Sequence, residues 1–360
     1  MQKRERIYSL DVLKILGTVI VVFHHYQQYM EVKFPNGVNY FFGQFFFGYV
    51  VELFFLLSGF FAWHYVKKIQ DGLSFRQFFG KTWLRFAPFL VLGAFASGLL
   101  HIVYQKLFYA PFMDTSVSLW NILKAALGIH SGWMFAPQEP INGHTWYISV
   151  LLLCYVILWC LVRISQRKNI SPCLLFAGMT VLGIFLWETK CGLPFLYKDN
   201  ARGYMSFFFG LLMAQLLEIA PVGRKGTLSC LAVILLLTFL FAAKYTYVAD
   251  GLNYLLLYVY FPCFVIVFLS EPMQKLFRHT LVGTVSAISF NTYMWHGSIL
   301  LALRILTNLR PQLIPLQNRT TMYLVMVFCF LCGTVSHFAL EKPYNKYLST
   351  RSSRQIQQVQ

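Results

Sequence analysis

The sequence predicts an all-α polytopic membrane protein, a bundle of about ten transmembrane helices with both termini in the cytoplasm. This prediction rests on the composition, on a series of apolar segments, and on the distribution of Lys and Arg between the loops. Of the 360 residues, 58% are hydrophobic and 12% are charged. A soluble domain has about 25% charged residues. No polar block in the sequence is long enough to form such a domain.

Ten apolar segments alternate with polar loops, and most reach the length of about 20 residues that a bilayer core requires. They cover residues 9–28, 43–66, 86–107, 145–164, 172–188, 202–219, 227–246, 252–270, 284–306 and 320–340. The fifth and sixth are the shortest. We therefore expect one transmembrane domain over residues 1–346, a short polar cytoplasmic tail over 347–360, and no attached soluble domain.

The loop charges predict the orientation. With the N-terminus inside, about two thirds of the Lys and Arg residues fall in cytoplasmic segments. The net charge of +17 then reflects loops beside anionic lipid rather than nucleic-acid binding. Arg304, Arg310 and Arg319 fall on the predicted outside. They form either an ordinary solvated loop or a contact for an anionic acceptor.

Two local patterns do not change this fold class. The N-terminal MQKRER followed by an apolar run imitates a signal peptide, but Asp11 and Lys14 interrupt the run, so we expect a retained first span. Cys329 and Cys332 form a CxxC pattern inside an apolar run. We interpret them as packing residues and expect no metal site.

The first apolar segment contains four ionisable residues, Asp11, Lys14, His24 and His25. Such groups are costly in a bilayer and therefore indicate function. Lys14 and His25 are separated by roughly 16 Å along a helix, with Lys14 towards the inside. Asp11 and Lys14 have the spacing of an ion pair. The alternatives are that Asp11 only neutralises Lys14 and that the histidines are an interfacial polar pair.

Glu52 lies in the second apolar segment, about 13 Å below its outer start. A carboxylate facing His25 would hold the imidazole in one tautomer and support its charge, as a general base acting on a hydroxyl requires. Alternatively, Glu52 pairs with Lys14 as a buried structural charge. We predict that His25 and Glu52 face a common internal cavity.

The outer loop over residues 108–144 is the longest. It contains WNILKAALGIH, the pattern of a short amphipathic helix at the interface, and we expect the loop to act as a lid. His144, Trp146 and Tyr147 follow it, either to stack on a sugar ring or as part of the aromatic belt. Tyr293 and His296 lie within a later span, as acceptor-side candidates or as core residues.

Five stretches of the sequence together resemble one family: LDVLKILGTVIVVFHH, VELFFLLSGFF, FFGKTWLRFAPFL, SFNTYMWHGSIL and HFALEKPYNK. The first has a basic residue, ten intervening residues and a histidine, at Lys14 and His25. In this order over almost the whole chain, the stretches resemble the acyltransferase-3 family of membrane O-acyltransferases. The family usually has Arg where this chain has Lys14, which keeps the charge but loses the bidentate geometry.

The resemblance implies transfer of an acyl group, most commonly acetyl, from a cytosolic acyl-CoA to a hydroxyl of a cell-surface or lipid-linked glycan at the outer face. His25 would act as general base or acyl carrier. Lys81 and Arg85 would hold coenzyme A phosphates at the inner mouth, or only obey the topology rule. Lys14 would meet the donor or only hold Asp11. Acetyl-CoA is then a donor substrate, and no permanently bound cofactor is expected.

The same resemblance implies a multi-pass protein of a bacterial cytoplasmic membrane in contact with membrane lipid. The sequence is compatible with an oligomer. The sequence is also compatible with two rival functions. One is a transporter of an acyl group or small solute, for which the absence of a visible internal repeat is unfavourable. The other is a non-enzymatic membrane component of a polysaccharide export complex.

Overall fold

The computed structural model describes residues 6–43, 45–133, 140–243 and 251–357, and side chains as far as Thr350. Helices account for all the regular structure in these ranges. The longer helices are α1 (Tyr8–Met30), α2 (Val50–Gln70), α3 (Phe75–Phe108), α5 (Trp146–Lys168), α6 (Pro172–Thr189), α7 (Lys198–Ile219), α8 (Arg224–Ala242), α12 (Thr280–Leu309) and α13 (Arg319–Ser336). The shorter ones are α4 (Leu119–Leu127), α9 (Leu252–Leu255), α10 (Phe261–Leu269), α11 (Glu271–Phe277), α14 (Lys342–Gln357), the 3₁₀ turns η1 (Phe47–Tyr49) and η2 (Gly143–Thr145), and the π-helical turns η3 (Leu256–Tyr260) and η4 (His337–Glu341).

Each of the ten apolar segments coincides with a helix or a continuous helical run apart from its ends: residues 43, 45 and 46 precede η1, and residues 44 and 244–246 lie outside the described residues. Within the described ranges, eight helical runs are long and apolar enough to cross a membrane. The remaining two segments correspond to α7 and α12. The all-α polytopic class is confirmed. The count of ten spans and the cytoplasmic location of both termini stay predictions.

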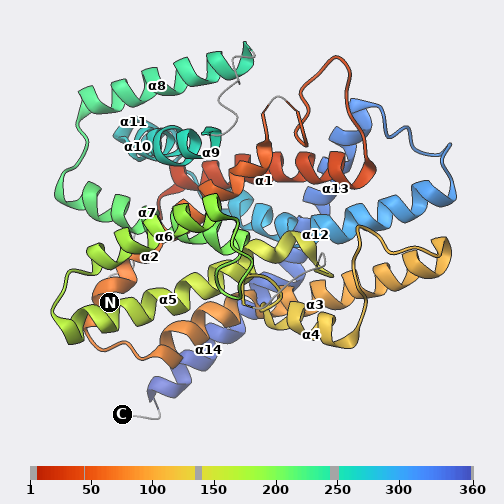
Figure 1. The fold of residues 1–360 in the computed structure, drawn as a ribbon. Helices are drawn as coiled ribbons and strands as arrows, with labels where there is room; N and C mark the ends of the chain where they lie inside the picture. The colour runs from red at the N-terminus through yellow and green to blue at the C-terminus, as the bar shows by residue number, and fades with distance from the viewer. Residues whose placement is uncertain (1–5, 44, 134–139, 244–250, 358–360) are drawn as a thin grey trace.

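Helices α7 and α12 carry more polar residues because other helices surround them. Helix α7 packs against α2 and α6, and α12 packs against α1, α3 and α13 (Figure 1). Polar side chains on these helices meet protein partners rather than lipid, which lowers their cost in the membrane. Close contact between α2 and α7 depends on Gly59 and Gly210, where an added Cβ would overlap the backbone of the facing helix.

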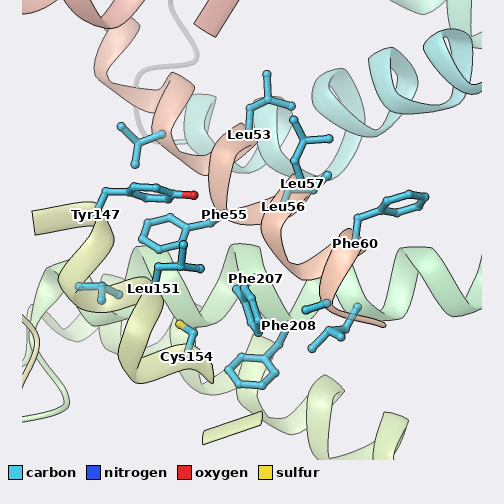
Figure 2. Packing of buried hydrophobic residues seen from close by; sticks show 14 of the residues in the cluster. Leu53, Phe55, Leu56, Leu57, Phe60, Tyr147, Leu151, Cys154, Phe207 and Phe208 are labelled. Atoms are coloured by element: carbon cyan, nitrogen blue, oxygen red, sulfur yellow. The ribbon is translucent and has the colours of Figure 1, made fainter. Parts of the chain in front are cut away.

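The main hydrophobic core lies where α2, α5 and α7 meet. Phe55 and Leu56 of α2 and Phe207 of α7 are fully buried. Figure 2 shows Phe55 beside Tyr147 of α5, and their ring centroids are 4.5 Å apart. Because Tyr147 also borders the site described below, this core holds one wall of the site in place.

Helix α3 begins eleven residues before the predicted third segment. Ser74 caps it through a capping box with Gln77, so the helix starts at Phe75 instead of residue 86. Its 34 residues span about 51 Å, more than the hydrocarbon core of about 30 Å. Lys81 and Arg85 therefore lie on the helix itself and not in the loop before it.

The long outer loop contains the predicted amphipathic helix, since α4 covers Leu119–Leu127. Residues 134–139 of the predicted lid lie outside the described residues. The end of the loop is not a cover over the protein but enters it. Asn142, His144 and Thr145 are all buried, and η2 contacts both α5 and α12.

Two of the three outer arginines hold the loop between α1 and η1. Arg304 makes a 2.9 Å ion pair with Glu31, and Arg319 donates to the carbonyl of Asn36. These two side chains are thus occupied by protein partners, which favours a structural role for them over acceptor binding. Arg310 is exposed.

The start of α1 and the end of α14 lie on the same side of the bundle (Figure 1). This arrangement agrees with the predicted placement of both termini on one side of the membrane. The segment expected as a polar tail, residues 347–360, is largely helical, because α14 continues to Gln357.

Candidate functional site

A cavity of about 550 Å³ lies beside α1, α2, α3, α5 and α12. Along α1 and its N-cap residue it extends from Ile7 to Thr18, and on α12 from Ser286 to Tyr293. His25 and Glu52 are not among the described residues that line it, so this cavity is not the common one expected for these two side chains. A volume of this size is that of a small-molecule site.

Charged side chains line the inner end of the cavity, taking the loop charges as the guide to orientation. Asp11 accepts from Arg6 at 2.5 Å and from Lys14 at 3.0 Å. The predicted Asp11–Lys14 ion pair is present, with Arg6 as an unforeseen second partner. Lys14 Nζ also lies 4.4 Å from the ring centroid of Phe61. Its side chain is 35% exposed, so the ammonium group reaches the cavity.

Of the two cations predicted at the inner mouth, only Arg85 lines the cavity. Its guanidinium lies 6.0 Å from the ring centroid of Phe290, and it makes no ion pair with a described residue. Lys81 is exposed and lies one turn earlier on α3. Glu341, from the closing EKP stretch, also lines the cavity and accepts from Asn291 at 2.7 Å.

The outer half of α1 meets α12 through two histidines. His25 Nδ1 lies 2.8 Å from His296 Nε2, and the two rings are stacked with centroids 4.9 Å apart. His296 Nδ1 lies 2.7 Å from the carbonyl oxygen of Tyr293. His296 is fully buried and His25 is half-buried. The sequence placed His296 among weaker acceptor-side candidates, and the fold makes it the direct partner of His25.

These contacts define the tautomers of the pair. A carbonyl oxygen only accepts, so His296 carries its proton on Nδ1 and presents the lone pair of Nε2. His25 must then donate from Nδ1, which leaves Nε2 of His25 as its basic nitrogen. His296 thereby takes the orienting position that a carboxylate occupies beside other catalytic histidines.

His144 packs on the other side of His296, with ring centroids 4.5 Å apart. Its Nε2 donates to the carbonyl of Met294 at 3.1 Å. The close approach requires Gly297, because an added Cβ at that position would overlap the His144 ring. Three imidazoles from three separate segments are therefore in contact.

His24 faces away from this pair. Its Nδ1 donates to the carbonyl oxygen of Tyr40 at 2.8 Å, which ties α1 to the loop that Arg304 and Arg319 hold. The contact of His24 with His25 is edge-to-face, with ring centroids 5.2 Å apart. We assign His24 to the placement of the outer loop.

Glu52 does not face His25 but forms a buried ion pair with Arg202 of α7. The carboxylate oxygens lie 2.6 and 2.7 Å from the guanidinium nitrogens, and Arg202 also donates to the carbonyl of Gly48 at 2.7 Å. Trp146 stacks on the other side, 4.9 Å from the guanidinium carbon to the ring centroid. The predictions that Glu52 pairs with His25 or with Lys14 are both wrong. Trp146, predicted as an acceptor-side candidate, contacts the Glu52–Arg202 pair instead.

Arg202, Tyr147 and Glu341 matter more in the structure than the sequence alone indicated. The sequence did contain an indication for Arg202, because it is a basic residue at the start of an apolar segment. A buried Glu52 needs such a residue as its ion-pair partner. The pairing itself joins residues 150 positions apart, which spacing alone does not reveal.

Among the described residues, no group of three or more His, Cys, Asp or Glu side chains is arranged to hold a metal ion. The arrangement instead offers a histidine with a defined basic nitrogen, whose partner His296 lies beside the cavity-lining Tyr293, and cations that line the cavity. The hydrogen-bonded pair of His25 and His296 is suited to proton transfer from a hydroxyl.

Comparison with known proteins identifies the family. No curated protein and no solved structure matches the chain. The family model described as an acyltransferase domain, that of the acyltransferase-3 family, matches residues 7–338, nearly the whole chain. The protein therefore belongs to the acyltransferase-3 family and is a membrane acyltransferase.

Proposed function

We propose that the protein transfers an acetyl group from cytosolic acetyl-CoA to a hydroxyl of a cell-surface or lipid-linked glycan at the outer face of a bacterial cytoplasmic membrane. The observation that carries the proposal is the hydrogen bond between His25 Nδ1 and His296 Nε2. It leaves His25 Nε2 as a base in a half-buried position at the outer end of α1.

The inner end of the cavity supports an anionic donor. Arg6, Lys14 and Arg85 line this end, and phosphates bind guanidinium and ammonium groups through charge-assisted hydrogen bonds. Arg85 is the first choice for a phosphate contact, because Arg6 and Lys14 already share Asp11. Lys81, which is exposed outside the cavity at its inner mouth, would only attract the anionic donor electrostatically.

The reaction needs one base and no other reagent. The acceptor oxygen attacks the thioester carbonyl carbon while its proton passes to His25 Nε2. The carbon–sulfur bond then breaks, and the proton passes from His25 to the thiolate. The products are an O-acetyl ester and free coenzyme A, so atoms and charge balance.

The test is a thiol-release assay on the purified full-length protein, with acetyl-CoA and a glycan acceptor. His25→Ala should lower turnover by about 10²- to 10⁴-fold, the usual contribution of a positioned base. His64→Ala is a matched control, since His64 lies on α2, where it bonds to the carbonyl of Phe61. Normal turnover by His25→Ala would refute the assignment. Solute flux without thiol release would support a transporter instead.

A further inference from the structure

Three aromatic rings form a cluster in which one ring lies next to His296. They belong to Phe54 of α2, Tyr147 of α5 and Tyr293 of α12, and all three line the cavity. Their centroids form a nearly equilateral triangle with sides of 6.0, 6.0 and 6.3 Å. The far side of the Tyr293 ring meets the imidazoles, 5.7 Å from His296 and 6.1 Å from His144 between centroids.

This aromatic triangle is closed. The centre of a triangle with sides near 6 Å lies about 3.5 Å from each corner, which is already the contact separation of two carbon atoms. The rings are also steeply inclined to one another, at 53°, 65° and 83°, so their edges occupy the remaining space. If an acyl group takes this route from the cavity towards the histidines, one ring has to move.

The two tyrosine rings are tethered. Tyr293 donates its hydroxyl proton to the carbonyl of His144 at 2.5 Å. The Tyr147 hydroxyl donates to the carbonyl of Phe54 at 3.2 Å and lies 2.8 Å from Ser58 Oγ. Moving either ring would break a hydrogen bond inside the protein, where an unpaired polar group is costly.

The Phe54 ring has no polar tether. It packs against Gly17 of α1, where an added Cβ would come within 2.7 Å of Phe54 Cζ. The side chain is half-buried. In the sequence, Phe54 belongs only to a family-like stretch and Gly17 has no predicted role. In the fold, the Phe54 ring, packed on Gly17, is the one ring of the triangle without a polar tether.

We infer that Phe54 determines the length of the acyl chain that reaches His25. Rotation of this single ring opens a gap bounded by the two tethered tyrosines, which admits an acetyl group. A longer chain would have to displace a tyrosine as well. This inference rests on the proposed function and adds its specificity: short-chain acyl thioesters are substrates, and longer ones are rejected at the aromatic triangle.

The test compares acetyl-CoA with butyryl-CoA in the thiol-release assay, using the full-length protein. Phe54→Ala should raise the ratio of kcat/KM for butyryl-CoA to that for acetyl-CoA by about tenfold or more, the range for methylene discrimination in an apolar pocket. Phe54→Leu, which removes less volume, should raise it less. Gly17→Ala should lower the ratio, because the added methyl group pushes the Phe54 ring towards the tyrosines.

Phe61→Leu is the matched control. Phe61 lines the same cavity on the same helix but lies at its inner end, beneath Lys14. Its replacement should leave the ratio unchanged. Thermal unfolding of each variant identifies any that fail to fold, and Phe54→Leu and Gly17→Ala keep the inference testable if Phe54→Ala is one of them.

The outcomes separate the two proposals. Folded Phe54 variants that transfer acetyl with an unchanged chain-length ratio would overturn the inference and leave the proposed function standing. A wild-type protein that consumes none of the acyl-CoA donors would overturn the proposed function itself. Opposite shifts in Phe54→Ala and Gly17→Ala would support the inference.

Discussion

The two ends of α1 accommodate polar groups in different ways. At the inner end, Asp11 and Lys14 are charged, form an ion pair, and line a cavity. At the outer end, His24 and His25 lie against protein and use backbone carbonyls and another imidazole as partners. Charges are thus kept where a cavity can admit water or an anionic ligand. Groups that can be neutral are placed where the packing is tighter.

The ion pair of Glu52 and Arg202 is the exception at the outer end. The Glu52 side chain is 1% exposed and that of Arg202 is 12% exposed. In the inner pairs Asp11 is also buried, at 5% exposed, but its partners Arg6 and Lys14 are 49% and 35% exposed. A buried pair has excellent geometry or it does not persist, because both charges have lost their hydration. The comparison therefore predicts unequal effects when each pair is broken.

The largest expected effect is that of Glu52→Gln. It leaves the buried Arg202 charge without its partner, and the free energy of unfolding should fall by about 3–5 kcal/mol. Asp11→Asn is the matched control, because the cations it releases reach the cavity, and its loss should be about 1 kcal/mol. Denaturant unfolding in detergent measures both. Equal losses would show that the inner pairs are as desolvated as the outer one.

An intermediate effect is expected at His296, which we assign as a positioning residue for His25. His296→Leu should lower kcat by about 10- to 100-fold, as loss of an orienting partner of a histidine does. His296→Gln should keep more activity, because the amide oxygen of the glutamine can accept a hydrogen bond from the N–H at His25 Nδ1. KM for acetyl-CoA should stay unchanged in both variants. Equal turnover in the two variants would show that His296 does not orient His25 and only fills space in the core.

A further expected effect is on stability alone and concerns packing around the outer imidazoles. Gly297→Ala should destabilise the protein by about 1–3 kcal/mol, because its methyl group displaces the His144 ring. Gly178→Ala in α6 is the control, since an added Cβ there meets no atom within 4 Å. That change should be neutral or slightly stabilising, as for Gly replaced by Ala in other helices. Thermal unfolding compares them. Tolerance of Gly297→Ala would mean that the outer end is loosely packed.

The fold class and the polarity of α1 were predictable from local sequence. Apolar runs of spanning length specify membrane helices whatever their neighbours are, because the backbone must satisfy its own hydrogen bonds in lipid. The i, i+3 spacing of Asp11 and Lys14 likewise places them together within one helix. The prediction for Glu52 failed because it assumed that segments adjacent in sequence supply each other's partners.

The sequence by itself determined that this is an all-α membrane protein, that α1 carries a cation and an imidazole on opposite halves, and that the family motifs occur in order. Only the tertiary structure decided that His25 meets His296, that Glu52 meets Arg202, and that three aromatic rings of the cavity lining lie against one another. These contacts join positions 271, 150 and up to 239 residues apart. Helix periodicity acts over one or two turns, so such pairings depend on how the helices pack and not on any local pattern.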